Sequence, residues 1–177
     1  MVCSDASWPD PRDGVKAVKE ARIGWVIFHP NMKPQGFSLK VNASITDKLI
    51  VRKQQIMAVE AFASVAALHT SPDLFKGSDV VWFVDNESAA SSLIRGAARP
   101  EDIDKISVMA SLRANRLRSR IWWEWIDSDS NPSDGLSRAG ITDSWTLQQN
   151  WDLTDLGDVD WSFVFRDVDK LDFIDSP

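Results

Sequence analysis

The sequence predicts an α/β fold built on a mixed β-sheet, and three segments carry this prediction. Residues 37–44 alternate apolar and polar side chains, which is typical of a strand with one buried face. Residues 53–70 lack Gly and Pro and are rich in Ala, Met, Leu and Gln, which favours a helix. Residues 80–84 form a continuous apolar run, which is typical of a strand covered on both faces.

The remaining segments complete the order β-β-β-α-β-α-α-β-α. We expect strands at residues 2–7, 22–29, 37–44, 79–85 and 120–127, and helices at residues 53–70, 87–94, 100–118 and 131–139. Such an order implies that an antiparallel meander of the first three strands is joined to parallel strands by helical crossovers. The expected architecture is therefore a five-stranded mixed sheet flanked by helices.

Length and composition restrict the classes of protein that this chain can represent. With 177 residues and 44% hydrophobic side chains, it can bury the core of one domain. The longest apolar runs are far shorter than the roughly 20 residues that span a bilayer, so no membrane partner is expected. The single Cys cannot form an internal disulfide, and the N-terminus has no basic or apolar signal region. Both observations predict an intracellular protein, in cytoplasm or nucleus, that is not secreted.

The acidic charge is concentrated at the C-terminal end of the chain. Residues 151–177 hold eight Asp against one Arg and one Lys, which accounts for the whole formal charge of −6. This segment belongs to an acidic, aromatic C-terminal extension, which we expect over residues 141–177, after a folded domain over residues 1–140. Since the rest of the chain has no basic surplus, nucleic-acid binding would have to depend on a local patch or on metal ions.

Four carboxylates lie at positions that suggest a common site. Asp5 ends the first expected strand, Asp85 ends the apolar run, Glu60 lies within the apolar helix and Asp134 begins the last helix. Each has an ordinary structural alternative, as a cap, as an ion-pair partner or as a favourable first-turn acid. If they converge, they would repel one another, and a divalent cation with oxygen ligands, Mg²⁺ or Mn²⁺, would relieve that repulsion.

The residues around these acids resemble the motifs of the ribonuclease H family. Residues 3–7 look like its first-strand motif, residues 55–61 like its helix-A motif and residues 83–89 like its fourth-strand motif. Residues 131–138 are most similar to the version fused to the reverse transcriptases of retroelements. The resemblance covers about residues 1–140, and it implies the ribonuclease H-like fold, a five-stranded mixed sheet flanked by helices.

The resemblance also implies an activity, which is hydrolysis of the RNA strand of RNA–DNA hybrids to 5′-phosphate products. By position, Asp5 would bridge two Mg²⁺ ions, Glu60 and Asp85 would complete the ligands of one, and Asp134 would hold the other, with Mn²⁺ as a substitute. The implied partners are an RNA–DNA hybrid and a reverse transcriptase domain in the same parent chain. Residues with an expected role in substrate binding are Ser7, Trp8, Gln55, Asn86, Arg95, Arg113 and Arg116.

Two departures from the family keep other functions open. The loop before Asp134 lacks the His that many cellular members carry, and apolar residues 57–59 replace the polar ones expected before Glu60. One alternative is a nuclease of the same fold acting on another nucleic acid, although Ser7 and Asp134 depart from the patterns of exonucleases and integrases. Another is a non-catalytic scaffolding module. The basic residues Arg95, Arg113 and Arg116 are also typical of a solvated helix face, which is the alternative to phosphate binding.

Overall fold

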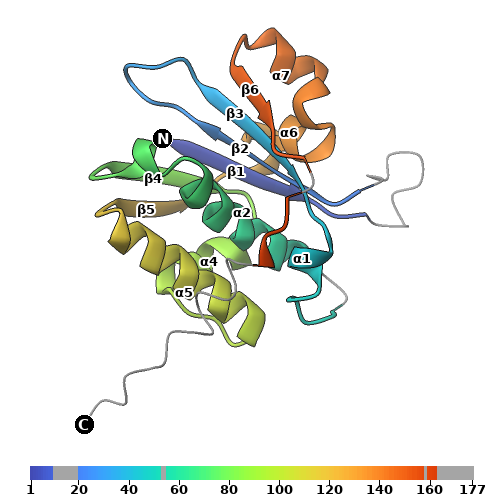
Figure 1. Ribbon diagram of the computed structural model, residues 1–177, viewed down its shortest axis with the longest axis vertical. Helices are drawn as coiled ribbons and strands as arrows, with labels where there is room; N and C mark the ends of the chain where they lie inside the picture. Colours follow the sequence, from blue (N-terminus) through green and yellow to red (C-terminus); the bar gives the residue numbers. More distant parts are fainter. Residues whose placement is uncertain (10–19, 53–54, 158, 163–177) are drawn as a thin grey trace.

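The computed structural model describes residues 1–9, 20–52, 55–157 and 159–162, which form a mixed sheet with helices on its faces (Figure 1). The strands are β1 Val2–Ser7, β2 Arg22–Ile27, β3 Gln35–Lys40, β4 Asp79–Val84, β5 Arg120–Trp125 and β6 Asp152–Asp155. The α-helices are α1 Ala43–Thr46, α2 Ile56–Thr70, α3 Pro72–Phe75, α4 Glu87–Arg95, α5 Glu101–Arg116, α6 Asp134–Arg138 and α7 Ser144–Gln148. Short 3₁₀ turns lie at Ser128–Ser130 and Gly140–Thr142.

Strand β1 lies inside the sheet, whose order is β5-β4-β1-β2-β3-β6. It pairs antiparallel with β2 over its whole length, from Val2 to Ser7. Its parallel pairing with β4 covers only Val2 to Ser4. Beyond Ser4 the two neighbouring chains diverge, and a notch opens at the carboxyl end of β1 and β4. Ligand sites of open α/β sheets commonly lie at such carboxyl ends, where the strand order changes direction.

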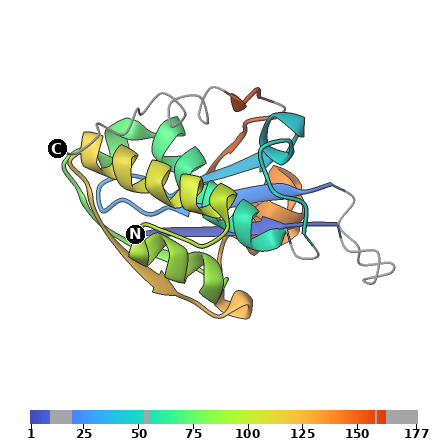
Figure 2. The ribbon, with the colours of Figure 1, turned by 90° about the horizontal axis from the view of Figure 1, so that it is seen from below.

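The core lies between the sheet and helices α2 and α5, which pack side by side (Figure 2). Helix α2 is buried on nearly all sides from Ala58 to Leu68, as its apolar sequence predicts. Aromatic side chains fill the space above the sheet. Trp25 stacks on Phe37 and Trp82 stacks on Phe75. No helix in the described part of the chain combines the length and apolar character needed to cross a membrane.

Helix α6 packs closely against the sheet because β2 has a glycine at the point of contact. A Cβ atom added at Gly24 would lie 2.6 Å from the Cβ of Leu136 and 2.6 Å from the backbone nitrogen of Ser137. Gly24 is also the residue paired with Asp5 on β1. The absence of a side chain at Gly24 therefore allows the α6 backbone to approach the strand that carries Asp5.

The expected count of five strands is wrong, because the sheet has a sixth. Strand β6 pairs in parallel with β3, from Gln35 opposite Asp152 to Ser38 opposite Asp155. It belongs to the segment expected as a C-terminal extension, from which Trp161 also packs into the core. The four residues of β6 carry two Asp and are largely exposed, so they lack the apolar alternation by which a strand is detected in sequence.

Two local predictions also need correction. Residues 80–84 are not covered on both faces, because Val81 is 44% exposed while Val80, Trp82 and Val84 are buried. The strand expected over residues 37–44 ends at Lys40, and helix α1 follows, capped by the Asn42 side chain, which accepts a hydrogen bond from the Ser44 N–H. Asn at a cap position competes with strand continuation, which the alternating pattern did not reveal.

The close approach of α6 predicts that Gly24→Ala is destabilising. The added methyl group overlaps backbone atoms of α6, which cannot move as a flexible side chain can, so we expect a loss of about 1–3 kcal/mol in the free energy of unfolding. Urea denaturation measures this loss. Gly77→Ala gives a comparison of a different origin, because nothing lies within 4 Å of its added Cβ and its loss of stability comes from the positive φ of +67° alone. Equal stability of Gly24→Ala and the wild type would contradict the packing described.

Candidate metal centre

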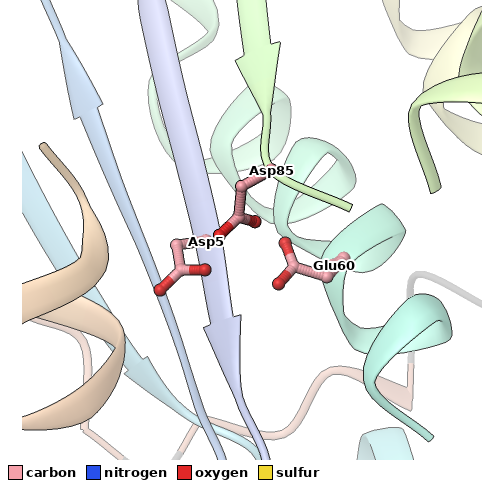
Figure 3. A group of neighbouring side chains, drawn as sticks. All are labelled: Asp5, Glu60 and Asp85. Atoms are coloured by element: carbon pink, nitrogen blue, oxygen red, sulfur yellow. The ribbon is translucent and has the colours of Figure 1, made fainter. Parts of the chain in front are cut away.

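Three carboxylates from separate elements converge in the notch beside β1. Asp5 comes from β1, Glu60 from α2 and Asp85 from the residue directly after β4 (Figure 3). Each offers one oxygen, and these three atoms all lie within 4.8 Å of one another. Three of the four acids selected from the sequence therefore lie close together.

The end of the β1–β4 pairing explains how Glu60 reaches this position. Since the pairing stops at Ser4, the N–H of Ala6 is not used by β4, and it donates a hydrogen bond of 2.9 Å to Glu60 Oε1. Glu60 thus occupies part of the gap that β4 leaves. Asp85 lies beside Asp5 because the residues directly before them, Val84 and Ser4, form the last pair of the β4–β1 ladder.

The three carboxylates are electrostatically unfavourable to one another. Asp5 is 3% exposed and Glu60 is 2% exposed. Burial raises the pKa of Asp5 to about 8, and the charges of Asp85 and Asp134 act in the same direction. Burial, together with the charges of Asp5 and Asp85, raises the pKa of Glu60 well above its usual value. A bound cation would replace the protons that such groups otherwise take up.

Unpartnered oxygens of the cluster are suited to a cation. Among the described residues, Glu60 Oε2 and Asp85 Oδ1 are buried and have no hydrogen-bond partner. A buried carboxylate oxygen without a partner is costly, because the water that would solvate it is excluded. Carboxylate oxygens without nitrogen or sulfur ligands suit a hard divalent ion such as Mg²⁺. The residues therefore fit a metal site.

Asp134, the fourth predicted acid, lies outside the group of three. It begins α6, and its Oδ1 accepts a hydrogen bond of 2.6 Å from Arg138 Nε, one turn further along the helix. It also lines a cavity of about 740 Å³ between the sheet, the loop after β5 and α6, together with Phe83 and Ser128. The Asp134 side chain is 37% exposed, and its charge still contributes to the raised pKa of Asp5.

Hydroxyl groups that the sequence analysis did not select hold two of the carboxylates. Ser137 Oγ on α6 donates a hydrogen bond to Asp5 Oδ2, and this contact partly offsets the rise in the pKa of Asp5. Ser128 Oγ donates to Asp85 Oδ2 at 2.7 Å. Ser137 lies three residues after Asp134, so helical spacing could have indicated that the two share a face. Nothing in the sequence pairs Ser128 with Asp85.

Several residues expected to bind substrate have structural contacts. Ser7 is buried and its hydroxyl donates to the backbone carbonyl of Ser137 at 2.6 Å. Asn86 caps α4, where its side-chain oxygen accepts from the Ala89 N–H at 3.0 Å. Trp8 and Gln55 are half-buried, and Gln55 Oε1 has no described hydrogen-bond partner.

The three arginines selected from the sequence lie at the ends of two helices. Arg95 is in the last turn of α4 and is exposed. Arg113 and Arg116 are in the last turn of α5, where Arg113 is half-buried and Arg116 is exposed. Cations at these positions also interact favourably with the helix dipole, so their placement fits both interpretations made from the sequence.

A scan against protein-family models found no match, and a search of curated proteins found none either. Among solved structures, RNase H1 from the halophilic archaeon Halobacterium salinarum NRC-1 is similar, with a TM-score of 0.53 and 16% identity over 81% of this chain and 97% of that one. The N-terminal RNase H domain of a Mycobacterium tuberculosis protein, solved as a fusion with maltose-binding protein, is also similar. Its TM-score is 0.54 at 16% identity, over 83% of this chain and 96% of the other.

These similarities identify the architecture. The chain has an RNase H-like fold, to which the sixth strand β6 is added at one edge. The likeness that the sequence motifs suggested is confirmed at the level of the fold.

The raised carboxylate pKa values predict how the metal-free protein responds to pH. Asp5 keeps its proton in the folded state up to about pH 8 but loses it near its ordinary value of 3.8 when unfolded. Its contribution to stability is therefore complete below that ordinary value and declines as the pH rises toward 8. With EDTA present, the free energy of unfolding of the wild type should fall relative to Asp5→Asn between pH 5 and pH 8. Asp47→Asn, an exposed control, should follow the wild type. Parallel curves for wild type and Asp5→Asn would contradict the prediction.

Proposed function

We propose that this chain is a metal-dependent endonuclease that hydrolyses the RNA strand of RNA–DNA hybrids, that is, a ribonuclease H. The observation that carries the proposal is the triad of Asp5, Glu60 and Asp85, of which the first two are buried and the third is half-buried, on an RNase H-like fold. Glu60 Oε2 and Asp85 Oδ1 are buried oxygens without a partner that could ligate a cation. Both similar solved structures are named as RNase H proteins, which supports the same activity here.

The proposed metal ligands divide between two positions. Asp5 would contribute to both, Glu60 and Asp85 would complete the first, and Asp134 with water would serve the second. Two Mg²⁺ ions held by these ligands, or Mn²⁺ in their place, would supply activation of a water and charge stabilisation at the leaving 3′ oxygen, which would give 5′-phosphate and 3′-hydroxyl products.

The protein's own contribution is to hold these oxygens before substrate arrives. Ser137 fixes one oxygen of Asp5, Ser128 fixes one of Asp85 and the Ala6 N–H fixes one of Glu60. Each carboxylate thus keeps its remaining oxygen for a cation. Such preorganisation avoids the reorganisation energy that flexible ligands would add to the reaction. Arg138 forms an ion pair with Asp134, and a metal ion bound at the second position would compete with this pair.

Hybrid recognition is proposed to involve the groups selected from the sequence. Gln55 precedes α2 by one residue, and its amide oxygen is buried without a hydrogen-bond partner. We propose that this side chain turns outward to meet a 2′-hydroxyl, the group that separates RNA from DNA. Trp8, Ser7 and Asn86 lie close in sequence to Asp5 and Asp85. Arg95, Arg113 and Arg116 are proposed to contact backbone phosphates.

The parent chain, the domain bounds and the location in the cell are proposed from the sequence. The sequence motif around Asp134 supports a parent chain with a reverse transcriptase domain, as in retroelements. A catalytic unit over residues 1–140, with residues 141–177 as an acidic extension, and an intracellular location remain predictions from the sequence.

A specific observation favours a second candidate, a nuclease of this fold that acts on another nucleic acid. The positions before Glu60 hold Met57, Ala58 and Val59, of which the last two are buried, so none of them offers a polar group to a 2′-hydroxyl. In contrast, the intact triad argues against a scaffolding module, because two buried carboxylates beside a third destabilise a fold that gains nothing from a metal.

Cleavage assays with Asp85→Asn test the proposed function. The substitution keeps the size of the side chain and removes the charge that would hold a metal, so Mg²⁺-dependent cleavage of a labelled RNA–DNA hybrid should fall by about 10²-fold or more. RNA–RNA and DNA–DNA duplexes, each with Mg²⁺ or Mn²⁺, separate the two candidate functions. Asp47→Asn is the matched control. Cleavage by Asp85→Asn at the wild-type rate would refute the site.

Thermal unfolding tests metal binding independently of activity. Mg²⁺ binds the folded state alone, so it should raise the melting temperature of the wild type in a concentration-dependent way. The shift should be smaller for Asp5→Asn, which loses a ligand, and unchanged for Asp47→Asn. Equal Mg²⁺ shifts in all three proteins would show that Asp5 does not ligate the ion.

A further inference from the structure

Strand β5 forms one edge of the sheet, at the opposite end from β6 (Figure 1). Within the described part of the chain it pairs only with β4. The N–H groups of Arg120 and Ile126 donate to the carbonyls of Ser78 and Val84. Because successive residues of a strand point their backbone groups to opposite sides, Ile121 and Trp123 direct theirs away from β4. The edge therefore offers free backbone donors and acceptors.

The exposed edge is unusually apolar. Trp122 is 68% exposed, and Val81, which is paired with it on β4, is 44% exposed. Edge strands of monomeric proteins are commonly protected by proline, by a bulge or by being very short. Strand β5 has six regularly paired residues, none of them proline. An apolar strip beside free backbone groups is typical of a surface that binds another strand.

The charges on this strand are arranged so that it complements itself. Arg120, Trp122 and Glu124 alternate along one face, with opposite charges on the two sides of the tryptophan. If two copies of β5 pair antiparallel about Trp122, Arg120 lies opposite the partner's Glu124 on both sides of the two-fold axis. An axis at Arg120 or at Glu124 would instead place like charges opposite each other, which is destabilising.

The backbone pattern agrees with the same register. Pairing about Trp122 sets Ile121 opposite the partner's Trp123, and both residues have backbone groups that point outward. These residues would form the hydrogen-bonded pairs. Trp122 then lies in a non-hydrogen-bonded pair, where side chains of two antiparallel strands approach most closely. Outward-pointing residues also meet if the axis passes through Ile121 or Trp123, but only the axis at Trp122 brings the two exposed tryptophans together and sets each Arg120 opposite a Glu124.

We propose that β5 is a dimerisation surface for a second copy of this chain, which joins the two sheets through an antiparallel β5–β5 pair centred on Trp122. The apolar band of Val81 and Trp122 in one protomer continues into the partner's Trp122 and the partner's Val81. Arg120 already contacts Asp79 through Nε and Nη2 at 2.6 and 2.7 Å. A guanidinium has five N–H donors, so its Nη1 can still donate to the partner's Glu124.

Charge reversal tests the register directly. In sedimentation velocity over a range of concentrations, the full chain should dimerise reversibly. Glu124→Arg and Arg120→Glu should each weaken the dimer by about tenfold or more, because both flanking pairs become repulsive. An equimolar mixture of these two variants should form a heterodimer, since every flanking pair is again of opposite sign. Glu101→Arg, the same charge change on the exposed first turn of α5, should dimerise as the wild type does.

Disulfide trapping gives a second measurement that does not depend on the charges. The single native cysteine, Cys3, is buried. Under mild oxidation, Trp122→Cys should form a covalent dimer, because the two thiols face each other across the axis. Trp125 is exposed but lies away from the two-fold axis, so the thiol of Trp125→Cys should remain reduced. A wild type that stays monomeric at every concentration, a mixture of charge variants that does not associate, or equal trapping at residues 122 and 125 would each overturn the proposal.

Discussion

Mutual repulsion among the carboxylates of Asp5, Glu60 and Asp85 is the constraint on which the rest of this structure depends. A fold selected for stability alone would not bury Asp5 and Glu60 and add the half-buried Asp85, with one oxygen of each within 4.8 Å of the others. The surroundings offset part of the cost, since the Ala6 N–H, Ser137 and Ser128 each donate a hydrogen bond to one carboxylate. Glu60 Oε2 and Asp85 Oδ1 still lack a partner, and a bound cation would supply one. The electrostatic cost of the metal-free carboxylates is thus linked to the proposed function of the site.

The positions of these three carboxylates are fixed by the packing and pairing of the elements that carry them. Strand β1 is held by full pairing with β2 on one side, while its shorter pairing with β4 leaves the notch open on the other. Gly24 allows α6 to approach closely enough for Ser137 to reach Asp5. Glu60 projects from a helix that is otherwise buried and apolar, so its position is fixed by packing rather than by its own charge.

The two edges of the sheet differ in a way that their composition explains. Strand β6 is four residues long and carries Asp152 and Asp155, so charge and shortness protect it from further pairing. Strand β5 has six residues and an exposed Trp122, with Arg120 and Glu124 on the same face. Helix α6 contacts β1, β2 and β3, and Val81 on β4 remains exposed beside Trp122. The outer half of the sheet thus presents both an apolar face and an open edge.

The sequence by itself predicted the first five strands, the main helices α2, α4 and α5, and a set of four acids that includes the three that meet, because apolar periodicity and an acid in an apolar segment are local signals. It missed the short helices α1, α3 and α7. It could not reveal β6, which is short, exposed and paired with a strand more than a hundred residues earlier. Nor could it show that Ser128 and Ser137 hold Asp85 and Asp5. Those contacts form because the loop after β5 and helix α6 fold back over β1, where Gly24 allows the close packing. Only the tertiary structure decides such long-range approaches, since they leave no periodic pattern in the chain.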